Sequence, residues 1–457
     1  MRSYPKYKPS GIDWIGEIPD SWIICKIRKV LNTLTDFSAN GSFADLAANV
    51  QYLDKPDYSR LVRLTDLREG LRNDGIYVSK EAHEYLSKSA LFGGEILMAN
   101  VGAYAGLVCL VPKINFVATL APNMFLLKFH KQIISNQYAF ILLGSDPYCK
   151  TLANIALSSA QPKLNKEDIR SVDLIFPSLS EQQQIADFLN HKTGQCDRFI
   201  RNRQKQIELL NEQLRFKINQ AITKGINSKV KFKATDIKYV PEIPDHWDIR
   251  KFKSLTSILT CGVAATPEYV EKHDGVLFLS AQNVKPFRMV FDKLAYIKPE
   301  LHEKLTRNKK PIKGDVLVTR IGGDSNIGDA CVVSIDSEFS VYVSLTHIRP
   351  NKEILSEYIV YFFNTEYCYQ LNHEGTVVAG GQGNLNVKNV ERYRIPLPPV
   401  EEQKEIITYL DNYRKEIDNL ISKYQKQIEL MQEYRTALIS QAVTGKIDVR
   451  DWKPQTK

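Results

Sequence analysis

The stretch QKQIEL at residues 204–209 occurs a second time at residues 425–430, 221 positions later. The match continues beyond these six letters. QKQIELLNEQLRFKINQAITKGI (204–226) and QKQIELMQEYRTALISQAVTGKI (425–447) share 12 identities in 23 positions. A fixed period of this kind indicates an internally repeated architecture, and it has to be recognised before any single element is assigned.

The same offset relates further landmarks upstream of these segments. They follow in the same order in both halves: IPDSW (18–22) with IPDHW (243–247), GEILMANVGAY (94–104) with GDVLVTRIGGD (314–324), QPKLNKEDI (161–169) with QGNLNVKNV (382–390), and FPSLSEQQQIADFL (176–189) with LPPVEEQKEIITYL (397–410). The chain is therefore predicted to be a tandem duplication of a unit of about 220 residues. Each unit consists of a globular part followed by a helix.

The composition is that of a water-soluble globular protein. With 457 residues, 43% hydrophobic and 25% charged, the chain is long enough for two or more domains with their own cores. Lys and Arg exceed Asp and Glu by 61 − 52 = 9. This modest basic excess suits a polyanionic partner, although many unrelated proteins share it.

Cysteine and histidine usage indicates neither disulfides nor a metal site. The seven Cys residues are scattered without a C-x-x-C motif, and the eight His residues form no H-x-x-x-H pair. This pattern fits a reducing cytoplasm. The N-terminal stretch MRSYPKYKPSGIDW lacks the apolar core of a signal peptide. We therefore expect a cytoplasmic protein that binds no metal.

One apolar stretch, ILMANVGAYAGLVCLV (96–111), resembles a membrane segment at first sight. It is shorter than the ~20 residues that a spanning helix needs. Its repeat partner, VLVTRIGGDSNIGDACVV (316–333), carries Arg320 and Asp329. Both copies are therefore predicted to form a strand, a Gly-rich turn and a second strand, with no membrane span.

Both repeated helical segments carry apolar residues at alternating steps of three and four, which is typical of a coiled-coil seam. In the second copy the seam is Ile406, Leu410, Tyr413, Ile417, Leu420 or Ile421, Tyr424, Ile428, Met431, Leu438 and Ala442, interrupted by Arg435; in the first it includes Ile185, Leu189, Cys196, Ile207, Leu210, Leu214 and Ala221, interrupted by Lys192, Arg203 and Lys217. Ser178 and Glu181 predict a capping box at the start of the first helix.

The two helices are predicted to pack on each other, because a helix of roughly 60 Å with a single apolar stripe is unstable alone. Their relative direction follows from the chain ends. The C-terminal tail run into the N-terminal segment resembles the join between the two units, so each unit is entered by a similar segment. Such a pseudo-symmetric ring requires antiparallel helices.

Taken together, the IPDSW motif, the G-[DE]-[IV]-L strand, the Q-x-x-L loop, the P-x-x-x-E-Q helix start and the Q-A-[IV]-T close, each present twice, resemble the specificity subunit of type I restriction–modification enzymes. The resemblance implies an α+β fold. Two pseudo-repeated α/β target recognition domains are joined by two long helices that form an antiparallel coiled coil. The expected boundaries are residues 1–175 and 227–396 for the domains, 176–226 and 397–447 for the helices, and 448–457 for a tail.

The resemblance also implies a function. Each recognition domain would read one half of a bipartite double-stranded DNA target, and the helices would dock two methyltransferase subunits. S-adenosylmethionine, ATP and Mg are then expected on the methyltransferase and motor-nuclease partners, with no cofactor on this chain. In agreement, the chain has neither an N-P-P-[YF] motif nor a G-x-x-x-x-G-K-[ST] loop, so no catalytic residue is predicted. The alternatives are a specificity subunit of a related two-site endonuclease and a coiled-coil adapter that does not bind DNA.

The two halves differ most between their shared landmarks, for instance VRLTDLREGLRNDG (62–75) against LFLSAQNVKPFRMV (277–290). If the shared framework fixes the position of the chain on DNA, the differing segments would read the bases. Arg or Lys would then pair with guanine, and Asn or Gln with adenine. The predicted DNA-binding residues are Arg60, Arg63, Thr65, Arg68, Asn100, Tyr104, Gln161 and Lys163 in the first half, and Ser280, Gln282, Asn283, Lys285, Arg320, Asn326, Gln382 and Asn384 in the second.

Overall fold

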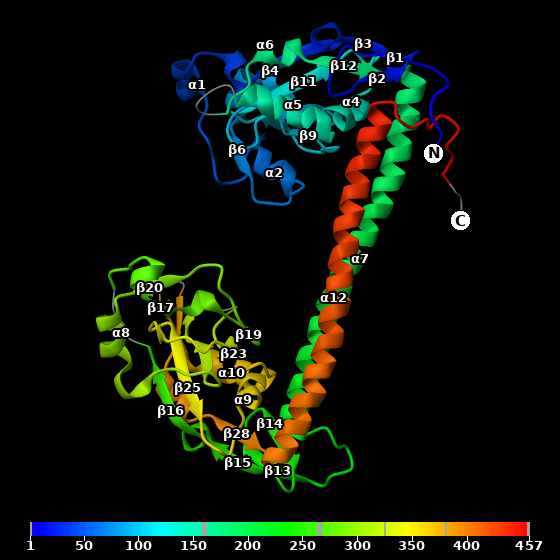
Figure 1. Cartoon of the computed structure of the whole chain (residues 1–457). Helices are drawn as coiled ribbons and strands as arrows, with labels where there is room; N and C mark the ends of the chain where they lie inside the picture. The colour runs from blue at the N-terminus through cyan, green and yellow to red at the C-terminus, as the bar shows by residue number, and fades with distance from the viewer. Residues whose placement is uncertain (1, 158–161, 263–266, 324–325, 380–381, 455–457) are drawn as a thin grey trace. The chain divides into compact units, whose positions relative to one another are not determined.

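The computed structural model describes residues 2–157, 162–262, 267–323, 326–379 and 382–454. The chain divides into two compact units (Figure 1). Unit 1 consists of Met1–Asn202 with Lys426–Lys457, and unit 2 is Arg203–Gln425. Unit 1 therefore contains both ends of the chain, and each of the two long helices contributes to both units.

Unit 1 is built on two four-stranded sheets. One has the antiparallel order β4-β11-β8-β9, and the other has the order β6-β5-β10-β7 with β5 and β10 parallel. The strands are β1 (Tyr7–Pro9), β2 (Glu17–Pro19), β3 (Ile23–Lys26), β4 (Leu31–Asp36), β5 (Ser59–Val62), β6 (Ile76–Val78), β7 (Ala90–Leu91), β8 (Ile96–Ala99), β9 (Val108–Leu110), β10 (Ala118–Leu120), β11 (Met124–Phe129) and β12 (Asp173–Phe176). The helices are α1 (Phe43–Asn49), α2 (Leu64–Arg68), α3 (Lys80–Tyr85), α4 (Asn136–Leu143), α5 (Asp146–Ala156), α6 (Lys166–Ser171) and the first part of α7 (Leu179–Lys224).

Unit 2 repeats this topology. Its sheets have the orders β16-β25-β21-β23 and β20-β17-β24, the latter again with one parallel pair, β17 and β24. The strands are β13 (Phe232–Ile237), β14 (Val240–Pro244), β15 (Asp248–Lys251), β16 (Thr256–Cys261), β17 (Val276–Leu279), β18 (Val284–Lys285), β19 (Arg288–Met289), β20 (Ala295–Ile297), β21 (Val316–Thr319), β22 (Ile321–Gly322), β23 (Ala330–Val332), β24 (Phe339–Val341), β25 (Leu345–Pro350), β26 (Thr376–Ala379), β27 (Gln382–Leu385) and β28 (Arg394–Leu397). The helices are α8 (Pro299–Thr306), α9 (Ser356–Phe363), α10 (Glu366–Gly375), α11 (Val387–Glu391) and the first part of α12 (Val400–Val443). The predicted duplication of an α+β unit is confirmed.

The G-[DE]-[IV]-L motif begins the central antiparallel strand in both units. Gly94 and Gly314 have φ angles of +85° and +89°, a left-handed conformation that glycine adopts without steric cost. The acidic residue that follows turns inward and closes the loop before the strand: Glu95 accepts hydrogen bonds from the backbone N–H groups of Phe92 and Gly93. The predicted strand–turn–strand at 96–111 is confirmed as β8 and β9. Within the described ranges, no helix has the length and apolar character that crossing a membrane requires.

The IPD-x-W motif is explained by a contact with the start of each long helix. Trp22 is buried, and its Nε1 donates to Glu181 at 3.0 Å; Trp247 is buried in the same way and donates to Glu402 at 3.0 Å. A buried indole N–H requires such an acceptor. The predicted capping box is therefore only half right, because the Glu181 N–H bonds to Ser178 Oγ at 3.4 Å while the Glu181 carboxylate accepts from Trp22 and from Tyr4.

The glutamine after this glutamate joins the same helix start to the globular part. Gln182 is completely buried; its Nε2 donates to the Pro177 carbonyl at 2.9 Å, and its Oε1 accepts from the Ser135 N–H. Gln403 makes the equivalent bond to the Pro398 carbonyl at 3.0 Å. The repeated E-Q pair is thus a structural lock that fastens each helix start to its globular part through buried hydrogen bonds.

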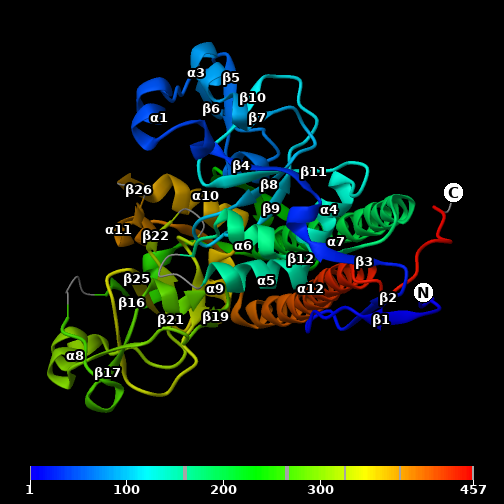
Figure 2. The same cartoon turned by 90° about the horizontal axis from the view of Figure 1, so that it is seen from above.

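Helices α7 and α12 lie side by side in Figures 1 and 2 and are antiparallel within each unit. The core of unit 1 joins the start of α7 to the end of α12 through Ile185, Leu189, Leu438 and Ala442, and the core of unit 2 joins the end of α7 to the start of α12 through Ile218, Ile222, Ile406 and Leu410. The predicted antiparallel coiled coil is confirmed.

Two of the predicted seam interruptions are contacts between the helices. Arg435 Nε lies 3.2 Å from Asp197 Oδ1, and the Arg203 guanidinium lies 4.7 Å from the centre of the Tyr424 ring. Of the two residues offered for one seam position, Leu420 is exposed and Ile421 is half-buried. Ile421 therefore occupies the seam.

Candidate nucleic-acid interface

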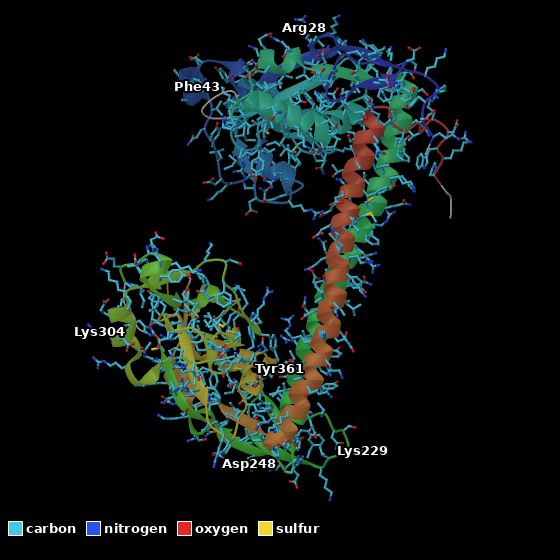
Figure 3. The ribbon with its side chains drawn as sticks, in the orientation of Figure 1. Arg28, Phe43, Lys229, Asp248, Lys304 and Tyr361 are labelled. Atoms are coloured by element: carbon cyan, nitrogen blue, oxygen red, sulfur yellow. The ribbon has the colours of Figure 1, made fainter. Side chains whose placement is uncertain are left out.

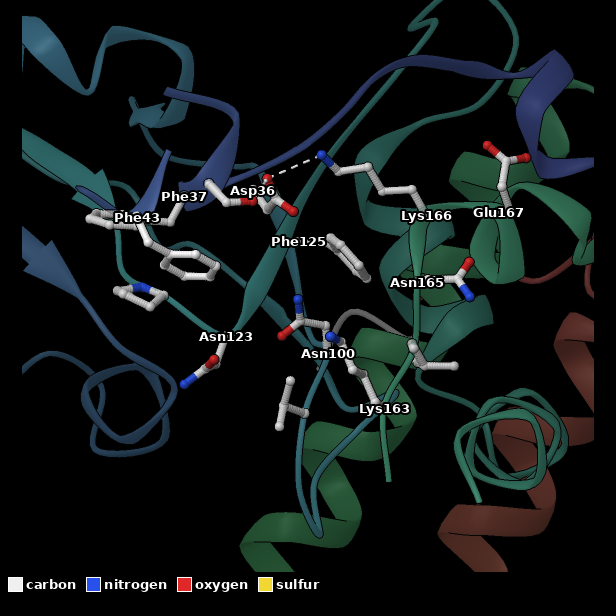
Figure 4. A pocket seen from close by; sticks show the side chains of 14 residues that line it. Asp36, Phe37, Phe43, Asn100, Asn123, Phe125, Lys163, Asn165, Lys166 and Glu167 are labelled. Carbon is white, nitrogen blue, oxygen red and sulfur yellow. Dashed lines mark hydrogen bonds and ion pairs between the residues drawn. The ribbon is translucent and has the colours of Figure 1, made fainter. Parts of the chain in front are cut away.

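Unit 1 contains a pocket of about 630 Å³ where the end of β4, helix α1, the start of β11 and the segment before α6 meet (Figure 4). Two of the predicted DNA-binding residues, Asn100 and Lys163, lie in its wall. The other side chains in the pocket include Asp36, Phe37, Phe43, Asn123, Phe125 and Lys166. Charged groups of both signs, amide groups and aromatic rings are therefore combined in one hollow, with Lys166 paired to Asp36 at 3.1 Å.

Backbone hydrogen bonds bring Asn100 and Lys163 together although they are far apart in sequence. The Leu164 N–H donates to the Asn100 carbonyl at 2.8 Å, and Val101 pairs with Lys163 in an isolated β-bridge. Asn100 Oδ1 is buried and accepts no hydrogen bond from any residue that the structure describes. An acceptor of this kind is costly to leave unmatched, so it favours a donor from outside the chain.

Arg68 and Tyr104 form a second grouping in unit 1. The Arg68 guanidinium lies over the Tyr104 ring, 4.7 Å from its centre, and both side chains are exposed. Thr65 is exposed on the same helix α2. A planar cation stacked on an aromatic ring is held in one orientation while its edge N–H groups remain available for base or phosphate acceptors. The structure therefore brings together three of the predicted residues at the solvent side.

Arg63 is held by an acidic neighbour. Its Nε and one terminal nitrogen donate to the two oxygens of the buried Asp66 at 3.1 and 2.8 Å. Burial raises the pKa of Asp66, but hydrogen bonds from Arg63 and from Asn73 outweigh burial and lower the pKa below its usual value. The same bonds raise the pKa of Arg63. Arg63 is thus a partly exposed cation, and some of its N–H donors are already bonded to Asp66.

Arg60 is used inside the fold. Its side chain is buried in β5, and its terminal nitrogens donate to the Leu71 carbonyl at 3.1 Å and to Asn73 Oδ1 at 2.6 Å. These bonds hold the turn after α2, where Leu71 has a φ of +60°. A contact between Arg60 and DNA stays a prediction.

In unit 2, Arg320 and Asn384 occupy the places that Asn100 and Lys163 hold in unit 1. Ile321 pairs with Asn384 between β22 and β27, and the Leu385 N–H donates to the Arg320 carbonyl at 2.8 Å. Arg320 is 8% exposed and donates to the Leu385 and Val343 carbonyls and to Asn384 Oδ1. The backbone arrangement is the same in the two units, but the side chains are different.

In the segment after β17, one predicted residue is buried and its neighbour is exposed. Asn283 is buried; its Nδ2 donates to the Val290 and Lys293 carbonyls, and its Oδ1 accepts from the Ser280 N–H. Gln282 is left exposed. Asn283 therefore shapes the loop that carries Gln282.

The remaining predicted residues of unit 2 lie on β18, in the segment before β23 and at the start of β27. Lys285 is half-buried in β18, and its charge partly offsets the effect of burial on Asp329, whose pKa is raised to about 6. Asn326 Oδ1 is buried without a hydrogen-bond partner among the described residues. Gln382 begins β27, and the predicted residue Gln161 of unit 1 lies outside the described residues.

The sequence prediction missed most of the residues that line the pocket, among them Phe43 and Asn123. Phe43, which opens α1, is 87% exposed and lines the pocket (Figure 4). Asn123 has a φ of +66°, which places it in a tight turn at the start of β11. Pro122 followed by Asn123 is typical of a turn in which the asparagine has a positive φ, so the sequence could have predicted this turn. Phe43 has no such signal, because one aromatic residue at a helix start does not reveal its exposure.

Comparisons with known proteins agree with this architecture. The family model for the type I restriction modification DNA specificity domain matches residues 37–209 and, a second time, residues 291–430. The chain is 26% identical over 367 residues to the type I restriction enzyme MjaVIII specificity subunit of Methanocaldococcus jannaschii, covering 78% of this chain and 80% of that protein. It is 24% identical over 451 residues to the type I restriction enzyme EcoKI specificity subunit of Escherichia coli, covering 93% and 91%.

Solved structures share the fold at low sequence identity. A chain from a study of complex assembly and conformational transition in the type I R-M system superposes with a TM-score of 0.69 at 15% identity, covering 94% of this chain and 99% of that one. The crystal structure of the HsdS subunit from Thermoanaerobacter tengcongensis gives a TM-score of 0.51 at 14% identity, covering 94% and 98%. The doubled family match, on a chain whose two units share one topology, shows that this protein belongs to the family of type I restriction–modification DNA specificity proteins.

Proposed function

We propose that the chain is the non-catalytic sequence-recognition subunit of a type I restriction–modification complex and that units 1 and 2 each read a different half of a bipartite DNA target. The observation that carries this proposal is the pair of equivalent positions beside the central sheets. Asn100 with Lys163, and Arg320 with Asn384, are held by the same backbone hydrogen bond and the same β-bridge. A constant frame with different polar side chains is what two recognition modules of different specificity require.

These residue types suit base edges and phosphates, but Arg320 itself is buried and its donors are bonded within the fold. Arg and Lys pair with guanine, and Asn and Gln pair with adenine in the major groove. The exposed residues Arg68, Tyr104 and Gln282 are our candidates for direct contact. Arg60 and Asn283 are instead buried and bonded to carbonyl groups, so they shape the loops that present the exposed residues.

We assign methyl transfer and DNA cleavage to partner subunits. Two methyltransferase subunits would supply S-adenosylmethionine, and motor-nuclease subunits would supply ATP and Mg. Helices α7 and α12 would dock these partners and separate the two recognition domains, whose proposed boundaries remain residues 1–175 and 227–396. The chain would act in the cytoplasm, and its seven cysteines are free thiols, as a reducing compartment requires.

The test is methylation mapping of cells that express the chain together with its methyltransferase partner. A motif of two specific parts separated by an unspecific gap is expected. Tyr104→Ala should alter one part only, and Gln282→Ala the other part only. Lys304→Ala, an exposed change on α8 (Figure 3), is the matched control and should leave both parts unchanged. A continuous motif, or a variant in one unit that alters both parts, would contradict the proposal.

A further inference from the structure

A cluster of metal-ligating groups lies in unit 2, apart from the predicted DNA-binding residues. His302 and Glu303 are neighbours on α8, and Glu338 directly precedes β24. One ligand atom from each residue lies within 4.8 Å of the other two. Helix α8 contacts β24, so the fold brings these three groups to one point although Glu338 is 338 − 303 = 35 positions from Glu303.

His302 supplies an unsatisfied donor atom to this cluster. Its side chain is 2% exposed, and Nδ1 lies 2.9 Å from Ser340 Oγ. Nε2 has no hydrogen-bond partner among the described residues, and its distance of 3.7 Å to Glu338 Oε2 exceeds hydrogen-bonding range. With Nδ1 protonated toward Ser340, the free lone pair is on Nε2 and faces the carboxylate. Hydrogen bonding of the second ring nitrogen is the usual way in which a metal-binding histidine is oriented.

The two carboxylates already share a cation. Lys310 Nζ lies 2.7 Å from Glu303 Oε1 and 3.1 Å from Glu338 Oε1. Glu303 and Glu338 are 61% and 64% exposed, so their side chains are free to change rotamer. A cavity of about 270 Å³, whose lining includes His302, Lys310 and Glu338, gives an ion access from solvent. The lysine neutralises the carboxylates but leaves the imidazole nitrogen unused.

We propose that His302 Nε2, Glu303 and Glu338 bind a divalent transition-metal ion, with Zn²⁺ as the best match, and that the ion displaces the Lys310 ammonium. An imidazole and two carboxylates are common zinc ligands, whereas Mg²⁺ and Ca²⁺ prefer oxygen ligands alone. Ligand atoms about 2.0–2.1 Å from a tetrahedral ion are about 3.3 Å from one another. The exposed carboxylates reach that spacing by a small rotamer shift. The ion would fasten α8 to β24 and thereby stiffen the sheet β20-β17-β24.

The experiment is a calorimetric titration of the full chain, freed of metal by a chelator, with Zn²⁺. One equivalent should bind. Glu338→Gln and Glu303→Gln should each weaken binding at least tenfold. Lys310→Gln should strengthen binding, because it removes the competing ammonium. Glu300→Gln, an exposed change on the same helix, is the matched control and should bind like the parent chain.

Several results would overturn the assignment. These are the absence of saturable Zn²⁺ binding, parent-like affinity of both glutamine variants, or weaker binding by Lys310→Gln. Titration with Co²⁺ separates this site from cysteine ligation, because thiolate charge-transfer bands would place the ion elsewhere. The readout needs neither DNA nor partner subunits, so its failure would leave the proposed DNA recognition untouched.

Discussion

Replacing Arg68 with alanine should weaken DNA binding while changing the folding stability only slightly. Arg68 is exposed, and its described contact is the stacking on Tyr104 at 4.7 Å. A cation–π contact at an exposed site contributes about 0.5–1 kcal/mol. For a unit of this size, 1 kcal/mol corresponds to about 2–4 °C in Tm, so thermal stability should fall only slightly. If the guanidinium reads one base, binding to the target should weaken by about 1–3 kcal/mol, which is about 5- to 150-fold.

Arg320→Ala is the matched comparison, because it removes an arginine that the fold uses. The side chain is 8% exposed and donates to two carbonyls and to Asn384 Oδ1. Leaving these acceptors without a donor should cost ~2–4 kcal/mol. Unit 2 should therefore lose roughly 5–15 °C in Tm. This variant should lose stability first, whereas Arg68→Ala should lose DNA binding first.

The assay is competition binding by the assembled complex at fixed salt, after its target has been found by methylation mapping. Parent and variant are compared on the target, on single-base variants of it and on scrambled DNA. A loss confined to one base pair assigns Arg68 to base reading. An equal loss on every sequence, with a salt slope shallower by ~0.9, assigns it to one phosphate. Unchanged binding to all three DNA sets would refute a role for Arg68 in the interface.

Three further predictions follow from the same structure. Burial raises the pKa of Asp315, but hydrogen bonds from His347 and Arg349 lower it to about 2. The ionised Asp315 therefore contributes ~2 kcal/mol to the stability of unit 2 above pH 4, and this contribution is lost as the pH falls toward 2. Asp315→Asn should therefore destabilise unit 2 by ~3–5 kcal/mol at neutral pH and reduce the acid sensitivity of urea unfolding, which an unchanged pH profile would contradict. Glu402→Gln should lower the free energy of unfolding by ~1–2 kcal/mol in the same assay, because Trp247 and His246 lose a charged acceptor. Stability equal to that of the parent would argue against a structural role for the E-Q pair. The isolated chain should transfer no methyl group from labelled S-adenosylmethionine to DNA, because it lacks the N-P-P-[YF] motif; incorporation by the pure chain would overturn the non-catalytic assignment.

Periodic features of this protein could be predicted from the sequence, because they depend on local spacing. The repeat of QKQIEL indicated two equivalent units; the sheet β4-β11-β8-β9 of unit 1 recurs in unit 2 as β16-β25-β21-β23, and the order β6-β5-β10 recurs as β20-β17-β24. The 3.5-residue apolar spacing indicated the coiled coil, since only that spacing keeps one stripe facing a partner helix. The resemblance to specificity subunits rested on the same repeated motifs, and it indicated DNA recognition without catalysis.

Which polar side chains remain available for contacts outside the fold was decided by the tertiary structure alone. Arg60 and Arg68 look alike in the sequence, but Arg60 donates to carbonyl groups of a folded turn while the exposed Arg68 stacks on the Tyr104 ring. The Glu181 carboxylate accepts a hydrogen bond from the buried indole N–H of Trp22, 159 positions away, instead of completing a local capping box. His302 likewise gained Glu338 only when α8 packed on β24. Burial and long-range hydrogen bonding depend on residues that are distant in the chain, and no local pattern contains them.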